Sequence, residues 1–210
     1  MSITVFVALQ SFTGLLDASS SVQDMYFSDY AVTNETVGIP SEAVKTLAEN
    51  DAVESVSTTR LSVFMPGAGD ILPFETDLSV QSHETLQLVN VDEAQLQIYA
   101  PNLSAQDKQA LKDGTGCLVK NPIAFSYGDT TVQQTDLTVG DTIQLGDRTL
   151  PVLGLIDTAI TINNDGFTNG VQLIVNDEIY CSLLGNDSYS EVYPTLQAVS
   201  YTHLTLPTNS

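Results

Sequence analysis

The sequence contains few basic residues: six Lys and Arg stand against 26 Asp and Glu, which gives a formal net charge of −20 over 210 residues. Proteins that bind nucleic acids use Lys and Arg to displace counterions from phosphates, so this composition excludes nucleic acid as a partner. It also argues against binding to anionic lipid head groups. Charged residues make up only 15% of the chain and the acids form no long run. We therefore interpret them as a soluble, self-repelling surface, with a cationic ligand as the alternative.

Cysteine and histidine are also scarce, with two of each. Cys117 and Cys181 belong to no CxxC pair, and His83 and His203 are remote from both cysteines in the sequence. This spacing excludes a zinc site. The cysteines could form one disulfide in an oxidising compartment, but each lies in an apolar stretch, which favours two separate buried thiols.

Motifs of serine hydrolases and of P-loop NTPases are absent: the sequence has no G-x-S-x-G and no GxxxxGK[ST]. His83 and Glu84 are adjacent, so in a strand they point to opposite faces, which is poor geometry for an acid–base pair. The segment 163–166 (NNDG), followed by Asn169 and Gly170, lacks the ligand spacing and the final Glu of a calcium loop and is better explained as a turn. We expect no catalytic, cofactor-binding or metal-binding residues, and the chain is predicted not to be an enzyme.

The first residues, Ser2–Leu16, carry no charge, and their apolar side chains go around a helix rather than along one stripe. No basic region precedes them, as a secretory signal would require, and the stretch is shorter than the roughly 20 residues of a full membrane span. A buried amphipathic helix is the alternative. We interpret residues 1–26 as the outer part of a transmembrane helix and a helical stalk. Because no Lys or Arg occurs between this stretch and Lys45, the following residues are predicted to lie on the non-cytoplasmic side.

The last residues, 199–210, differ from the rest of the chain. Val199–Asn209 (VSYTHLTLPTN) resembles a translated sequencing-adapter tail, and an ordinary C-terminal strand with a polar tail is the alternative. We expect this segment, with His203, to be non-native. The hydrophobic content of 42% then allows residues 27–198 to form one domain, or two small lobes that share a core.

Within this domain, strands and helices alternate irregularly, which indicates the α+β class. Capping and stop signals predict helices at Ser41–Asn50, Ser104–Asp113 and Asn176–Leu184, the last ending at Gly185. A short helix is also expected within Asn121–Gly128. Period-two alternation and turn signals predict strands at 29–33, 53–63, 86–90, 96–100, 116–119, 142–145, 149–156 and 171–175, with a hairpin turn at Gly146-Asp147.

Four segments in this order resemble the extracytoplasmic core domain of FtsX-like and MacB-like ABC transporter permeases. An apolar helix leads to the strand Asp29-Tyr30-Ala31-Val32, and the helix in Pro40–Ser57 (PSEAVKTLAENDAVESVS) precedes the next strand. A further helix ends in the strand of Leu111–Val119 (LKDGTGCLV). The element Leu137–Leu145 (LTVGDTIQL) is then followed by the strand Val152–Asp157 (VLGLID). Gly-Asp turns are common in β proteins, so the order of the four segments carries the resemblance.

The resemblance implies a two-lobed mixed α/β domain on a membrane stalk, located at the cell membrane on the extracytoplasmic side. It further implies a cytoplasmic ABC ATPase subunit and a second permease subunit as partners, and an extracellular peptide, lipid or protein as substrate. The domain would couple ATP hydrolysis to substrate export or to an extracellular partner. The chain departs from the family pattern in having no later membrane helices. The alternative function is a membrane-anchored or secreted cell-surface binding or adhesion module; an extracellular hydrolase is the weakest candidate.

Overall fold

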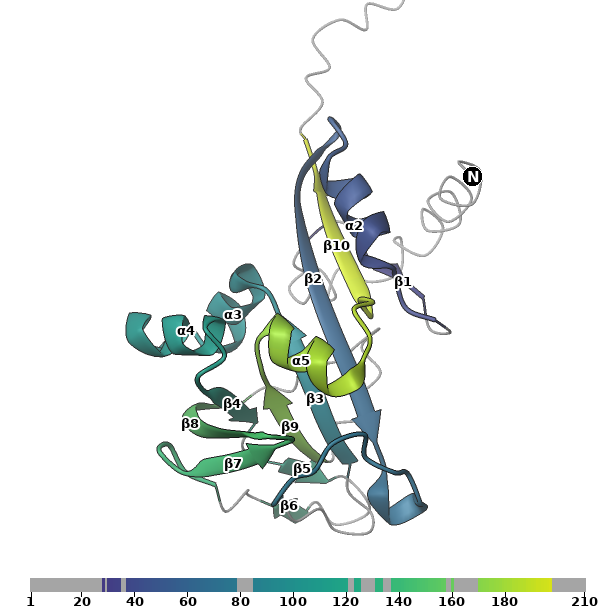
Figure 1. The fold of residues 1–210 in the computed structure, drawn as a ribbon. Coiled ribbons are helices and arrows are strands. Elements are labelled where there is room, and N and C mark those ends of the chain that lie inside the picture. Colours follow the sequence, from purple (N-terminus) through teal and green to yellow (C-terminus); the bar gives the residue numbers. More distant parts are fainter. Residues whose placement is uncertain are drawn as a thin grey trace, which may run out of the picture.

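The fold is described from a computed structural model, and the description covers residues 28, 30–34, 37–78, 85–120, 123–125, 131–133, 137–157, 160 and 170–197 (Figure 1). The helices are α2 (Ser41–Ala48), α3 (Glu93–Tyr99), α4 (Ala105–Lys112) and α5 (Asp177–Leu184), with a 3-10 turn η3 (Pro66–Ala68). The strands are β1 (Val32–Thr33), β2 (Val53–Phe64), β3 (Thr85–Val91), β4 (Cys117–Lys120), β5 (Ile123–Phe125), β6 (Thr131–Gln133), β7 (Thr142–Leu145), β8 (Arg148–Ile156), β9 (Gly170–Ile174) and β10 (Glu191–Leu196).

Eight of these strands form one mixed sheet in the order β1-β10-β2-β3-β9-β4-β8-β7, and β5 pairs with β6 separately. The pairs β3–β9 and β4–β8 are parallel, and the other neighbours are antiparallel. Since helices cover a mixed sheet, the predicted α+β class with mixed α/β content is confirmed.

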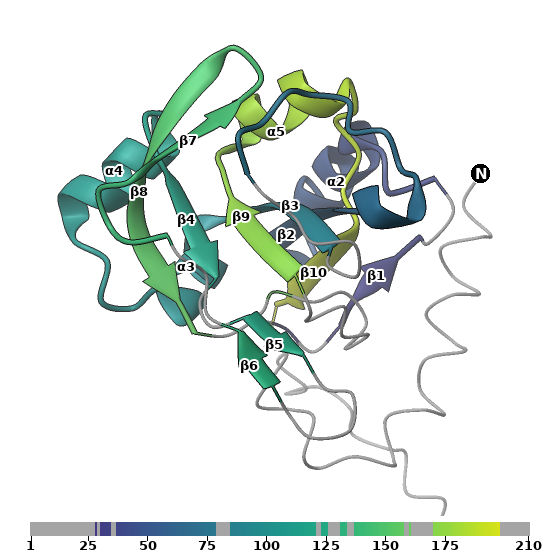
Figure 2. The ribbon, with the colours of Figure 1, turned by 90° about the horizontal axis from the view of Figure 1, so that it is seen from below.

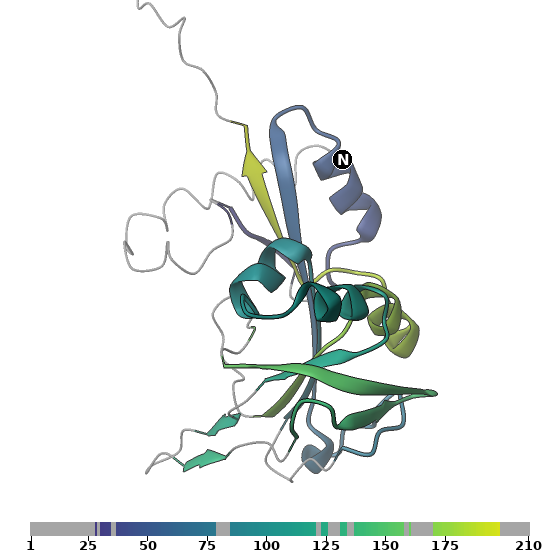
Figure 3. The ribbon, with the colours of Figure 1, turned by 90° about the vertical axis from the view of Figure 1, so that its left-hand side faces the viewer.

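Strand β2 divides the sheet into two lobes. It has 12 residues, and its first part, Val53 to Thr59, pairs with β10. From Thr59 to Phe64 it pairs with β3 on its other edge. The small lobe therefore consists of β1, β10, α2 and the first half of β2. The large lobe contains the second half of β2 and the strands β3, β9, β4, β8 and β7 (Figures 1 and 3).

The large lobe has a hydrophobic core on each face of its sheet. Because neighbouring strand residues point to opposite faces, Leu173 lies in one core and Ile174 in the other. Helix α5 covers the first core through Ile179 and Tyr180. Helices α3 and α4 contribute to the second core (Figure 2).

The small lobe has one smaller core. Its buried members are Ile39, Val44 and Val192, and Leu47, Val56 and Tyr189 pack against them. Helix α2 supplies Val44 and Leu47 and lies over β2 and β10 (Figure 1).

Local sequence signals account for most helix ends. The Ser104 side chain accepts a hydrogen bond from the Asp107 amide (3.1 Å), and Asn176 accepts one from the Ile179 amide (2.9 Å). Gly185 ends α5 in the left-handed conformation at φ 62°, which favours glycine. These contacts confirm the two helices predicted from capping signals. For α2 the sequence predicts Ser41 as the N-cap, and this is wrong by one residue, because Pro40 holds the N-cap position and no side chain caps the helix.

Two predicted elements are wrong. Leu96, Ile98 and Ala100 alternate like a strand, but they lie in and just after helix α3. The Asp92 side chain accepts a hydrogen bond from the Gln95 amide (3.0 Å) and caps this helix, so that Leu96 is buried and Ile98 is exposed. In the segment predicted as a short helix, Ile123–Phe125 is strand β5.

Several expectations fall on residues outside the described part of the chain. These are the apolar helix and stalk of residues 1–26, the adapter-like segment 199–210, the pair His83–Glu84 and the turn at 163–166. Among the described residues, no helix combines the length and apolar character needed to cross a bilayer.

Candidate functional site

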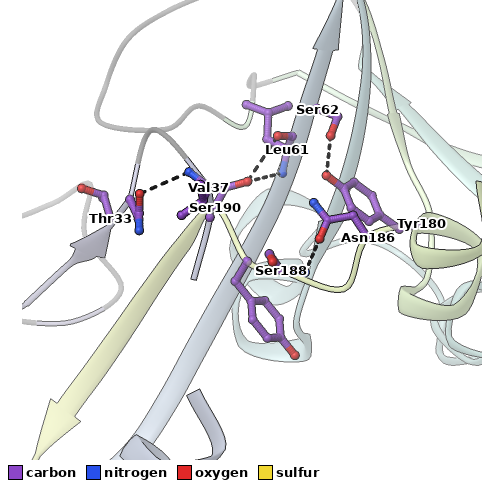
Figure 4. A pocket seen from close by; sticks show the side chains of 11 residues that line it. Thr33, Val37, Leu61, Ser62, Tyr180, Asn186, Ser188 and Ser190 are labelled. Carbon is purple, nitrogen blue, oxygen red and sulfur yellow. Dashed lines mark hydrogen bonds between the residues drawn. The ribbon is translucent and has the colours of Figure 1, made fainter. Parts of the chain in front are cut away.

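A pocket lies at the junction of the two lobes, with a volume of about 570 Å³. Small and large lobe both contribute to its wall (Figure 4). Most lining side chains carry neutral hydroxyl, phenol or amide groups, and none of the described lining residues is Lys, Arg, Asp or Glu. The lining residues are Thr33, Asn34, Val37, Gly38, Leu61, Ser62, Tyr180, Asn186, Ser188, Tyr189 and Ser190. Small-molecule sites have similar volumes.

Hydrogen bonds fix the polar groups of this pocket. The Tyr180 hydroxyl lies 2.7 Å from the Ser62 hydroxyl, which joins α5 to β2. The Ser190 hydroxyl accepts from the Leu61 amide (2.9 Å) and donates to the Leu61 carbonyl (3.2 Å). Burial raises the pKa of Tyr180, while the bond to Ser62 lowers it by a smaller amount. The phenol therefore stays protonated as a hydrogen-bonding group.

Arg60 lies directly behind the pocket and connects both lobes. Its guanidinium stacks on the Tyr189 ring at 3.7 Å from the ring centre. It donates to the Asn90 side chain (3.2 Å) and to the Asp187 carbonyl (2.9 Å), and it pairs with Asp177. Arg60 is 2% exposed, so these partners replace its water shell. Only its Nε lacks a partner among the buried side-chain atoms of the described residues.

The opposite face of the junction is also polar. The buried Gln95 side chain accepts from the Thr59 hydroxyl (2.8 Å) and donates to the Ser57 hydroxyl (3.0 Å). On the adjacent strand, Tyr193 donates to the buried Glu191 carboxylate. Desolvation raises the pKa of Tyr193, and the bond to Glu191 raises it further. Buried hydrogen bonds of this kind fix one arrangement of the two lobes.

The two cysteines are separate, as the sequence favoured. Both thiols are free; Cys117 is buried and Cys181 is half-buried. Burial raises the pKa of Cys117 to about 12, and its sulfur lies 3.7 Å from the Pro151 carbonyl oxygen. A thiol with so high a pKa is a poor nucleophile at neutral pH. In the described ranges, no group of three or more His, Cys, Asp or Glu side chains is arranged to hold a metal ion.

The arrangement thus offers binding groups and mechanical connections between the lobes. Sequence reasoning named no site residues and missed the junction. Its lining comes from β1, the loop before α2, the middle of β2, α5 and the loop before β10. The one available signal was Arg60, a lone basic residue inside an alternating strand of an acidic chain.

No protein-family model matches the chain, and a search of curated proteins finds no match. Solved structures with a similar fold include the extracellular domain of the ABC-type transporter YknZ from Gram-positive bacteria, with 12% identity over 77% of this chain and 75% of that one, at a TM-score of 0.46. Another is the periplasmic region of MacB from Actinobacillus actinomycetemcomitans, with 9% identity over 81% and 69% of the two chains, at a TM-score of 0.43. The first of these structures is an extracellular domain and the second a periplasmic region.

Proposed function

We propose that the chain is the extracytoplasmic domain of an ABC transporter permease subunit. In this role it couples ATP hydrolysis by a cytoplasmic subunit to the movement of a substrate or of an extracellular partner. It performs no chemistry itself, and it works as one of a pair of permease subunits in the cell membrane.

The placement of the first and last described strands supports this proposal most directly. Val32 of β1 pairs with Val192 of β10, and the Ser28 hydroxyl donates to the Pro194 carbonyl. The chain therefore enters and leaves the domain side by side, at the end of the small lobe. A domain inserted between two neighbouring membrane helices requires this arrangement, because both of its connections lead to the same membrane surface.

The polar junction supports the coupling role. A displacement of the small lobe reaches the large lobe through β2 and through the contacts of Arg60 with Asn90, Asp187 and Tyr189. The uncharged Ser2–Leu16 stretch upstream of the domain fits a membrane helix on that side.

The proposal is tested on the full-length gene product in its native cells. Protease added outside intact cells should cleave within the domain, and affinity purification from detergent should recover an ABC ATPase subunit. Reconstituted complexes should show ATP-dependent transport that is lost when residues 30–197 are replaced by a short linker. A full-length protein that lacks further apolar spans and an ATPase partner would contradict the proposal and favour the surface binding module.

A further inference from the structure

The second half of β2 has an unpaired edge that opens toward the pocket. Strand β10 pairs with β2 only as far as Thr59, while Leu61 to Phe64 pair with β3 on the opposite edge. Among the residues that the structure describes, no strand pairs with the pocket-side edge of Leu61–Phe64. Proteins usually protect such edges, because an extended chain can add to them.

The direction of the backbone groups follows from the neighbouring hydrogen bonds. The Thr59 carbonyl accepts from the Ser190 amide (2.9 Å), and the Leu61 amide and carbonyl both bond to the Ser190 hydroxyl. Alternate residues of a strand direct their backbone groups to the same edge. The N–H and C=O of Val63 therefore point to the open edge as well. The Ser190 hydroxyl holds the position that the backbone of a paired strand would take beside Leu61.

The pocket continues from this edge with groups that suit an extended peptide. Thr33, Asn34, Ser62 and Ser188 present neutral donors and acceptors, and Val37, with 70% of its surface exposed, offers an apolar contact. A segment that pairs with Val63 would extend into this space, in line with β10.

The charge of the chain selects among such segments. With a net charge of −20, the domain repels acidic segments and attracts basic ones.

We propose that the edge of β2 at Leu61–Phe64 and the adjoining pocket bind an extended, net-positive peptide segment of another protein by strand addition. Backbone hydrogen bonds at Val63 supply affinity, and the pocket supplies selectivity. The inference depends only on the domain's own surface and is independent of the transporter proposal.

The test selects random ten-residue peptides, displayed on phage, on the immobilised 210-residue chain. Synthetic copies of the selected peptides are then measured by fluorescence anisotropy. Val63→Pro removes the amide that faces the open edge and leaves the β3 ladder intact, because that amide does not bond to β3. We expect Val63→Pro to weaken binding by about tenfold, which corresponds to the loss of one hydrogen bond.

Val63→Thr is the matched control, since it keeps both the amide and the β-branched shape and should bind as the wild type does. Peptides methylated at alternate backbone nitrogens should bind at least tenfold more weakly than their unmethylated copies, which tests the same bonds without altering the protein. Selected peptides should be rich in Lys and Arg, and 0.5 M salt should weaken their binding to the chain. The proposal is overturned if no peptide is selected, or if methylation leaves affinity unchanged. Equal binding to a folded Val63→Pro variant would overturn it as well.

Discussion

The two lobes share one sheet but differ in how they are stabilised. The large lobe buries apolar side chains on both faces, with strands such as β9 buried along their whole length. The small lobe has a single core of three buried residues under α2, and the first half of β2 is mostly exposed or half-buried. Burial of apolar area is the main source of stability, so the small lobe is the weaker unit.

Contacts with the large lobe hold the small lobe in position. It shares β2 with the large lobe, and buried polar contacts at Thr59 and Arg60 join the two on both faces. The large lobe should therefore unfold as a unit, while the small lobe should open separately once the junction is weakened.

The largest effect is expected in the large-lobe core. Leu173→Ala removes a side chain that is 0% exposed, and it should lower the free energy of unfolding by about 2–5 kcal/mol through lost burial and a cavity. Urea denaturation followed by circular dichroism measures this change. Ile98→Ala, at a residue 63% exposed on α3, is the control and should change stability little; equal losses would refute the two-core description.

Arg60→Met should have the next largest effect, about 1.5–3 kcal/mol, because it leaves the Asn90 oxygen and the Asp187 carbonyl without their donor. The variant should also separate the urea transition into two steps, with the small lobe first. Arg60→Lys keeps the charge but loses the planar, forked donor geometry. Its free energy of unfolding should lie between those of the wild type and Arg60→Met. A single, unshifted transition in Arg60→Met would show that Arg60 does not join the lobes.

Val192→Ala tests the small lobe alone. Val192 is 0% exposed in the small core, and its truncation should cost about 1–2 kcal/mol. Hydrogen exchange should accelerate in α2 and β10 and stay unchanged in β9.

Cys117 reports on the large lobe: because its pKa is about 12, its thiol should stay unlabelled by iodoacetamide at pH 8 until that lobe opens. Labelling of Cys117 at the rate of small-lobe exchange would contradict separate opening.

The smallest effect is expected at the turn before β7, far from the junction. Asp141 accepts from the Thr138 amide (2.7 Å) and hydroxyl (2.9 Å), and these bonds hold the pKa of its carboxyl below its ordinary value. The stabilisation is therefore present above the unfolded-state pKa of about 4 and is lost as pH falls through the lower folded-state value. Asp141→Asn should lower Tm slightly at pH 6, and the difference from wild type should narrow toward pH 3. Asp147→Asn, which makes the same change of charge in the next turn, is the control. A Tm difference between wild type and Asp141→Asn that widens toward pH 3 would contradict the assigned bonds.

Local signals in the sequence predicted most elements of both lobes; in the small lobe α2 and β2 lie where they were expected, and only β10 was missed. Asn176 and Gly185 bracket α5 as expected, and Gly146 turns the β7–β8 hairpin. The helix α3 was mistaken for a strand because alternation over a few residues fits either structure. The Asp92 side chain caps the segment and favours the helix.

Strand β10 was missed because Pro194 interrupts its pattern. Proline is tolerated there since, among the described residues, β1 pairs only with Glu191 and Val192, so that no strand partner requires an amide from Pro194. The pocket at the junction depends on contacts between residues more than 100 positions apart, such as Ser62 with Tyr180. No local pattern encodes contacts of that separation.

The continuity of β2 has a mechanical consequence. An extended strand of this length spans about 40 Å, and hydrogen-bonded neighbours hold it at both ends. The described chain crosses between the lobes only along β2 and through the segment from α5 to β10, and these two connections run side by side (Figure 1). The domain is therefore stiff against pulling or pushing along the strand axis and compliant against sideways bending, so a force applied beside Ser28 and Leu196 arrives at the distant end of the large lobe as a displacement in the same direction.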